Sequence, residues 1–203
     1  ENSSSQYLTA SSQTSPDAAL TINAGTIDIT GEVKTQNIET LNLNALGYIR
    51  LSDALTTITT AGQEGWRGLL YSAGKMTLTA ARIYTTTDSA FELRSDQDIT
   101  FLKSGVTLTD AIYSALGELT VSAQNIYHFG DIAAPYGTIS LNARERVFLA
   151  DGSVLSVAGE TSVFYGEYDS ENGKWYGMDK SQPNITYTEQ IESLPEKQIT
   201  ITG

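Results

Sequence analysis

A five-residue pattern of alternating aliphatic and small polar residues, closed by Ala, recurs along the chain. In each copy Leu, Ile, Met or Val fills the first and third positions, and Thr, Asn or Ser fills the second and fourth. The copies span residues 20–24, 41–45, 76–80, 119–123 and 139–143. Alternation with a period of two is typical of a strand with one buried face. The pattern therefore predicts five short strands whose aliphatic side chains point inward.

The spacing of the copies predicts a repeating unit. They begin 21, 35, 43 and 20 residues apart. The short intervals predict a unit of about 20 residues, and the long ones predict about two units each. Residues around Ile58 and Phe91 would then belong to units whose pattern has decayed, with 91–95 as a degenerate copy.

Stacking of these units predicts an all-β fold. A single strand of this length cannot bury its own apolar face, whereas strands stacked copy upon copy bury a continuous core. We therefore predict a parallel β-helix with coils of about 20 residues over 16–159. A β-sandwich is the structural alternative, and it would favour two-residue turns such as Asn-Gly or Asp-Gly. Such turns occur late in the chain, at Asp151-Gly152 and Asn172-Gly173.

The regions that flank these coils differ in composition. Residues 1–15 are rich in Ser and Thr and predict a flexible lead-in. Residues 160–194 are rich in aromatic residues and predict a hairpin excursion, in which 163–168 pairs with 174–178 across a polar turn. Residues 195–203 resume the alternation and predict the start of a further, truncated coil.

Charge and composition exclude several classes of function. Asp plus Glu number 24 against 12 Lys plus Arg, for a net charge of -12. This excess of negative charge argues against nucleic acid as a partner. No apolar run approaches the roughly 20 residues of a membrane span, so no membrane insertion is expected. The chain has no Cys and a single His, His128, so we expect no metal site and no cofactor.

One stretch carries a family resemblance. Residues 130–143 read Gly-Asp-Ile-Ala-Ala-Pro-Tyr-Gly-Thr-Ile-Ser-Leu-Asn-Ala, and 147–159 continue with Val-Phe-Leu-Ala-Asp-Gly-Ser and Ser-Val-Ala-Gly. This resembles the coils of filamentous haemagglutinin-like exoproteins, the large adhesins of two-partner secretion in Gram-negative bacteria. The stretch Leu194-Pro195-Glu196-Lys197 before 199–201 resembles a family element that opens another coil.

The resemblance implies a right-handed β-helix in a secreted or cell-surface protein associated with the outer membrane. It also implies cell adhesion and virulence, with the remaining coils of the parent exoprotein as neighbours. The secretion signature of the family, Asn-Pro-Asn followed by Leu or Gly, is absent here, so an internal repeat segment is expected. No Arg-Gly-Asp motif supports integrin binding.

Two candidates for catalysis have simpler structural readings. Asp96 and Asp98 stand two apart, and paired carboxylates could bind calcium or share a proton, as polysaccharide-cleaving β-helical enzymes require. The expected reading is a polar turn between two strands. His128 alternates with Ile126, and we expect a corner histidine with a backbone hydrogen bond, not a catalytic base.

The candidate binding residues are Tyr165, Tyr168, Trp175 and Tyr176 in the aromatic segment. Exposed aromatic rings stack on sugars and dominate protein contacts, although the rings could instead pack the hairpin against the coils. Trp66 invites the same two readings.

Three functions follow. The leading hypothesis is a non-catalytic segment of the β-helical shaft of an adhesin. The alternative is an adhesive module that contacts a host or bacterial surface glycan or protein through the aromatic hairpin. The third is a polysaccharide lyase or hydrolase.

Overall fold

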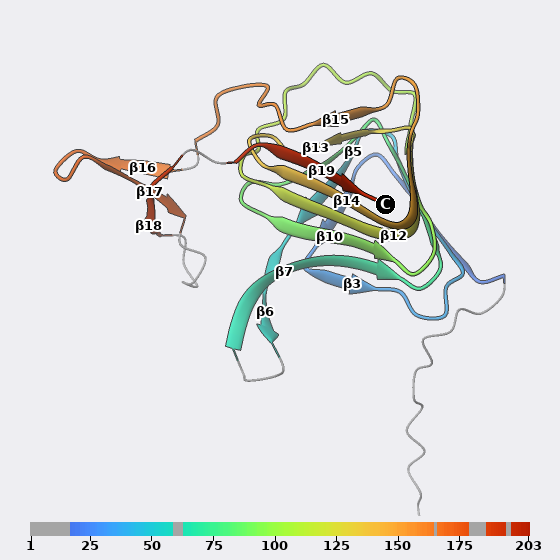
Figure 1. Cartoon of the computed structure of the whole chain (residues 1–203). Helices are drawn as coiled ribbons and strands as arrows, with labels where there is room; N and C mark the ends of the chain where they lie inside the picture. Colours follow the sequence, from blue (N-terminus) through green and yellow to red (C-terminus); the bar gives the residue numbers. More distant parts are fainter. Residues whose placement is uncertain (1–16, 59–62, 165, 179–185, 194–195) are drawn as a thin grey trace, which may run out of the picture.

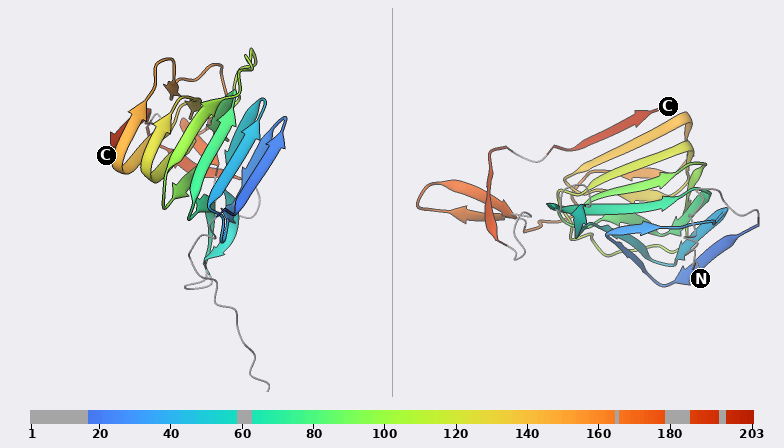
Figure 2. Two further views of the ribbon diagram at one scale, coloured as in Figure 1. Left: turned by 90° about the vertical axis from the view of Figure 1, so that its right-hand side faces the viewer. Right: turned by 90° about the horizontal axis from the view of Figure 1, so that it is seen from below.

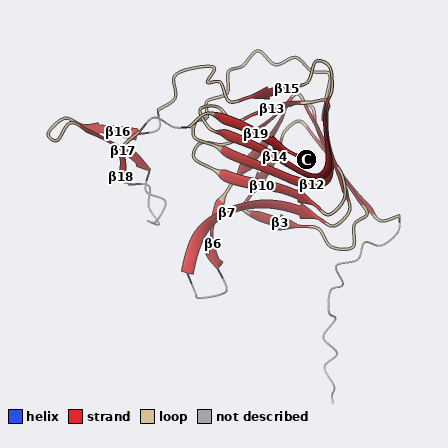
Figure 3. Ribbon diagram, viewed as in Figure 1, coloured by secondary structure: helices blue, strands red, loops and turns tan. Residues whose placement is uncertain are grey.

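The computed structural model describes residues 17–58, 63–164, 166–178, 186–193 and 196–203, and all regular elements in this part of the chain are strands (Figures 1 and 3). Most strand pairs are parallel. Within the described ranges, antiparallel pairing joins β6 to β7 and β17 to β16 and β18. The prediction of an all-β molecule is confirmed. The same described residues contain no helix long and apolar enough to cross a membrane.

The parallel strands form three rows, in which strands from successive passes of the chain lie side by side. The first row contains β1 (Ala19–Ala24), β4 (Thr40–Ala45), β8 (Lys75–Ala80), β11 (Ile99–Lys103) and the second halves of β12 (Glu118–His128) and β14 (Thr138–Leu149). The second row contains β2 (Ile27–Thr30), β5 (Tyr48–Ser52), β9 (Arg82–Thr85), β13 (Asp131–Ala133) and β15 (Val154–Ser156). The third row contains β3 (Glu32–Lys34), β7 (Gln63–Ser72), β10 (Ala90–Ser95), the first halves of β12 and β14, and β19 (Gln198–Thr202).

The chain visits the three rows in order, and one such visit is called a circuit here. β12 and β14 each continue from the third row into the first without a break, which joins these two rows into one curled sheet (Figure 2). The second row forms the separate five-stranded sheet. The three rows together are called the stacked body.

The core of the stacked body consists of aliphatic side chains held in register. In the first row, Leu41 pairs with Met76, Met76 with Ile99, and Ile99 with Ile126. All four are almost fully buried. The aliphatic positions of the recurring pattern therefore point inward in four of the five copies, as predicted. In the remaining copy Leu20 is 38% exposed, because β1 is the outermost strand of its row.

The five copies do not form one stack. The copies at 20–24, 41–45 and 76–80 lie in the first row, whereas those at 119–123 and 139–143 lie in the third row. The degenerate copy at 91–95 pairs in register with the copy at 119–123. Both rows require the same alternation, so the pattern alone cannot tell one row from the other.

The prediction that the interval from residue 41 to residue 76 holds two units is wrong. Leu41 and Met76 are direct neighbours in the first row, so the interval is a single circuit. Its extra length is an antiparallel extension, in which β6 (Ala54–Ile58) pairs with the start of β7. A hairpin lengthens the circuit without adding a strand to the stack.

One circuit lacks its second-row strand. After β11 the chain runs as a loop through 104–117, and β9 pairs directly with β13 of the following circuit. The loop is anchored by Ile112 and Ala115, which are buried, and by Ser114, whose hydroxyl donates to the carbonyl of Thr85 at 2.7 Å.

A small antiparallel sheet interrupts the last circuit. It contains β16 (Gly166–Asp169), β17 (Lys174–Met178) and β18 (Tyr187–Ile191), and it lies to the side of the stacked body (left in Figure 1). The chain then returns to the third row, where β19 pairs with β14. This three-stranded sheet is therefore an insertion between a second-row strand and a third-row strand.

Candidate functional site

The turn of the aromatic hairpin is closed by its own polar residues. The carboxylate of Asp169 accepts two hydrogen bonds, from the amide of Glu171 at 2.8 Å and from the side-chain nitrogen of Asn172 at 2.6 Å. Gly173 has a φ of 72°, a conformation that Gly adopts at little cost. Asp, Asn and Gly in this order thus fix the turn that sets Tyr168 opposite Trp175.

Alternation along the strands divides the aromatic residues between two faces. Tyr168, Trp175 and Ile191 are partners across the three strands and so share one face. The rings of Tyr168 and Trp175 lie 5.2 Å apart between centroids and are tilted by 46°. Tyr168 is 50% exposed and Trp175 53% exposed. This face therefore presents two adjoining, half-exposed rings to solvent.

A groove of about 490 Å³ runs along the same face, and it is called the aromatic groove here. Its lining residues are Val163, Phe164, Gly166, Trp175, Ile191, Glu192 and Ser193. Ile191 lies across two strands, because Gly166 and Gly177 have no side chain in its way: a Cβ at either would meet Ile191 at 3.2 or 3.4 Å. The groove combines apolar walls with one carboxylate and one hydroxyl.

A second pocket, of about 590 Å³, is more polar. Its lining residues are Glu167, Tyr168, Asp169, Ser170, Glu171, Tyr176, Tyr187 and Thr188. The hydroxyl of Tyr176 accepts a hydrogen bond from the Asn172 side chain at 3.0 Å. Tyr176 therefore supports the turn from the other face and does not join Trp175.

The four predicted binding residues do not form one patch. Tyr168 and Trp175 lie together, Tyr176 lies on the opposite face, and Tyr165 falls outside the described residues. Phe164 and Ile191 also line the aromatic groove, although neither was a predicted binding residue. The period-two alternation of β16 and β17 could have separated Tyr176 from Trp175. Trp66 lies apart, on β7 opposite Leu55 of the β6 hairpin, and is 38% exposed.

The candidate carboxylate pair is divided between two partners. Asp96 accepts the hydroxyl of Tyr71 at 2.6 Å, and Asp98 accepts the side-chain nitrogen of Asn125 at 2.8 Å. Both lie in the turn between β10 and β11, as the polar-turn reading expects. No group of three or more metal-binding side chains occurs in the described part of the chain.

His128 is a buried structural residue. Its Nε2 lies 2.9 Å from the carbonyl oxygen of Val154, so Nε2 carries the proton and donates. Its Nδ1 is buried and has no hydrogen-bond partner. The ring packs edge-on against Phe101, at 5.8 Å between centroids. Burial holds the pKa of His128 below its ordinary value. The predicted backbone hydrogen bond is confirmed.

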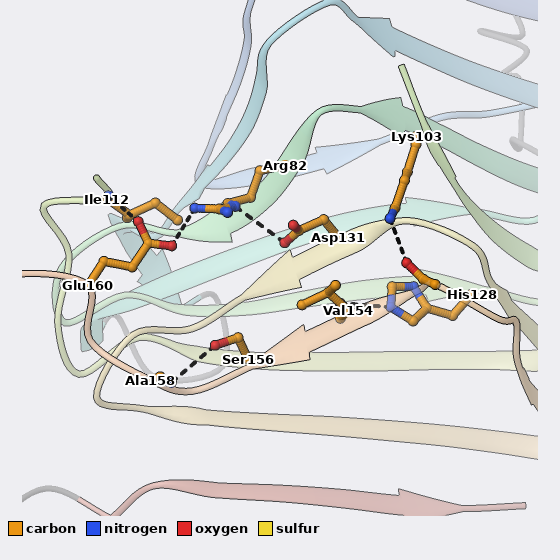
Figure 4. Close-up of polar contacts among 10 residues, drawn as sticks. Arg82, Lys103, Ile112, His128, Asp131, Val154, Ser156, Ala158 and Glu160 are labelled. Atoms are coloured by element: carbon orange, nitrogen blue, oxygen red, sulfur yellow. Dashed lines mark hydrogen bonds and ion pairs between the residues drawn. The ribbon is translucent and has the colours of Figure 1, made fainter. Parts of the chain in front are cut away.

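A cluster of charged residues that the sequence did not predict fastens the loop 104–117 to the stacked body (Figure 4). Arg82 pairs with Asp131 at 3.3 Å and with Glu160 on its other side. Glu160 also accepts the amide of Ile112 at 3.1 Å. Arg82 and Glu160 are 78 residues apart in sequence, and they come together through stacking of the circuits. Because both carboxylates of the cluster are engaged with Arg82 and Glu160 also holds the amide of Ile112, we assign the cluster a structural role.

Comparisons of the chain with protein-family models, with curated proteins and with solved structures gave no match.

Proposed function

We propose that the three rows are the faces of a right-handed parallel β-helix. The support is the register: each row is parallel, and the chain visits the rows in the same order in each circuit, apart from the one circuit in which the loop 104–117 replaces the second-row strand. Crossover connections between parallel strands are nearly always right-handed, because strand twist favours that hand. Circuits near the expected length of about 20 residues occur between Leu20 and Leu41 in the first row and between Val121 and Leu141 in the third row, whereas the circuit with the β6–β7 extension takes 35 residues.

We further propose that the chain is a non-catalytic segment of the shaft of a large secreted or surface-exposed bacterial adhesin. The observation that carries this proposal is the unbroken in-register stacking of the first row from β1 to β14. Six strands at about 4.8 Å spacing extend about 24 Å along the stack. Such a column lengthens by one step for every added circuit, which suits a part that holds another module away from a cell.

The outer surface of the stacked body fits this role. Polar side chains form ladders along the rows: Asn44 donates to Asn23 at 2.9 Å, and Thr202 donates to Asn142 at 2.8 Å. These ladders, together with the net charge of -12, keep an extended surface soluble and limit non-specific association. In the polysaccharide-cleaving alternative Asp96 and Asp98 would act together, whereas each is held by a different neighbour.

The shaft proposal is tested by the location of the parent protein in intact bacteria. Antibodies raised against the chain should label the surface of unbroken cells or the culture medium. Labelling that appears only after lysis would contradict the proposal. Calcium-dependent depolymerisation of a polysaccharide by the purified chain, abolished by Asp96→Asn with Asp98→Asn, would instead favour the enzyme hypothesis.

A second candidate function is adhesion through the three-stranded sheet. It is favoured by one observation, the half-exposed rings of Tyr168 and Trp175 on a sheet that lies outside the stacked body. A host-cell binding assay tests it directly: the full chain should bind cells, and Trp175→Ala should bind less.

A further inference from the structure

We propose that the aromatic groove, together with the neighbouring ring of Tyr168, binds a neutral saccharide. The inference rests on the second candidate function, adhesion through the three-stranded sheet, and it names the ligand class. Trp175 supplies the stacking surface, while Glu192 and Ser193 supply hydrogen-bonding groups at the same groove.

The exposure of the rings is the first argument. Phe91 and Phe101 in the stacked body are 3% and 0% exposed, whereas Trp175 is 53% and Tyr168 50% exposed. Apolar area left in water forgoes about 25 cal/mol for each Å² that a partner could cover. Two adjoining rings in this state form a surface that a ligand with an apolar side would stabilise.

The size of the face argues for a small ligand. Strands of four or five residues are about 17 Å long at most, and three strands span about 14 Å. The face of the sheet is therefore roughly 240 Å², well below the roughly 800 Å² that each partner buries in a stable protein complex. The groove volume of about 490 Å³ lies within the range of small-molecule sites.

The lining chemistry selects a ligand that is apolar on one side and rich in hydroxyls at its edge. Val163, Ile191 and the Trp175 ring provide apolar walls, against which the C–H face of a sugar ring can stack. The carboxylate of Glu192 can accept hydroxyl donors, and the Ser193 hydroxyl can donate or accept. A purely aliphatic ligand would leave both polar groups unused.

Charge excludes anionic saccharides. Within the described residues 163–164, 166–178 and 186–193, the one basic residue is Lys174, which donates to Gln190 at 2.8 Å. The acidic residues in the same part are Glu167, Asp169, Glu171, Glu189 and Glu192. This field repels sialic acid, sulfate and phosphate groups, so the saccharide that binds here is uncharged.

The test uses a glycan array probed with the full chain. The array carries neutral oligosaccharides ending in glucose, galactose, mannose or N-acetylhexosamine, together with sialylated and sulfated counterparts. We expect binding to neutral members only, with the same affinity at low and high salt. Trp175→Ala should weaken binding at least about tenfold, Trp175→Phe should weaken it less, and Trp66→Ala, which changes the other Trp of the chain, should leave it unchanged.

Several results would overturn the proposal. The first three are the absence of neutral-glycan binding by the folded chain, equal binding by Trp175→Ala, and preference for sulfated members of the array. A separate titration with choline gives the fourth: an affinity that falls with added salt would reveal a site for cations. A cell-binding arm separates this inference from adhesion itself. If the chain binds enzymatically deglycosylated cells as well as untreated cells, adhesion stands and the saccharide proposal fails. If it binds neither kind of cell nor the array, both fail.

Discussion

The stacked body and the three-stranded sheet are both built from short strands, but they differ in how far the side chains of those strands are buried. In the stacked body each interior strand buries its apolar face between the neighbouring circuits, so Leu78 and Phe101 are completely buried. Among the described residues, the three-stranded sheet is separate from the stacked rows and meets the stacked body only along an edge, where Thr87, Asp88 and Leu116 share a pocket with it. Its Tyr168 and Trp175 remain half exposed. The comparison shows that stacking supplies stability, while the insertion is free to present side chains.

Replacing a stacked aliphatic residue should have the largest effect. Leu78→Ala should lower the free energy of unfolding by about 2–5 kcal/mol, because it leaves a cavity between Leu43 and Phe101. Ile22→Ala is the matched control: Ile22 lies in the same stack beyond Leu43, on the outermost strand, and is 40% exposed. It should cost about 1 kcal/mol or less. Urea unfolding measures both, and equal losses would contradict the stacking account.

Adding a side chain where two circuits approach closely at a corner should have the next largest effect on stability. A Cβ at Gly137 would meet the backbone carbonyl of Gly117 well inside contact distance. Gly137→Ala should therefore cost about 1–3 kcal/mol in urea unfolding. Gly25→Ala is the control, since nothing lies within 4 Å of its added Cβ. It should change stability by less than about 0.5 kcal/mol. A tolerated Gly137→Ala would mean that the circuits are less closely stacked.

Titration of His128 should contribute to the pH dependence of the free energy of unfolding. Burial lowers its pKa in the folded state, so the unfolded chain binds the proton more readily. The stabilising effect of the neutral ring is complete above the unfolded pKa of about 6.5 and is lost as the pH falls towards the folded pKa. The slope should reach at most about 1.4 kcal/mol per pH unit.

His128→Leu tests this assignment by unfolding at pH values on either side of that range. Phe101 and Leu149 hold the corresponding register positions in the circuits on either side, so an apolar side chain is in keeping with the row. The variant should lose this part of the pH dependence, even though the Val154 carbonyl loses its donor. An unchanged profile would assign the dependence to other groups.

The charged cluster beside the insertion should have the smallest effect. Glu160→Gln removes the ion pair with Arg82 and should cost about 1 kcal/mol or less, because the carboxylate is partly exposed. The amide of Ile112 should exchange with solvent faster, since its acceptor is weakened. Glu32→Gln, which breaks the exposed pair with Lys34, is the control and should have no measurable effect. If the exchange rate of the Ile112 amide is unchanged in Glu160→Gln, the charged cluster does not hold the loop 104–117 in place.

The sequence predicted the part of the fold that repeats. Alternation at 41–45 and 76–80 marked strands that are in fact stacked neighbours, and it placed their aliphatic residues correctly in the core. It could not assign copies to rows, because a strand of any row needs the same alternation. The spacing also predicted two units in the 35-residue interval, which holds one circuit, because the β6–β7 hairpin adds length without adding a circuit.

The candidate site was less accessible to sequence reasoning. The aromatic composition of 160–194 pointed to the correct segment, yet the groove depends on Phe164 and Ile191 as well as on Trp175. Ile191 reaches the groove through pairing of β17 with β18 beyond the first hairpin. The contact between Arg82 and Glu160 depends on which circuits are adjacent. Contacts of this kind come from tertiary stacking and leave no local pattern.

Native-state hydrogen exchange of the full chain can show whether the stacked body unfolds as one cooperative column while the three-stranded sheet opens as an appended unit. Amides in the interior strands β4, β8, β11 and β12 should exchange only through global unfolding, with one common free energy. Amides in β16, β17 and β18 should exchange through a separate opening of lower free energy, which Leu78→Ala leaves unchanged. Protection of β16–β18 at the global free energy, falling together with that of β8 in Leu78→Ala, would contradict the account.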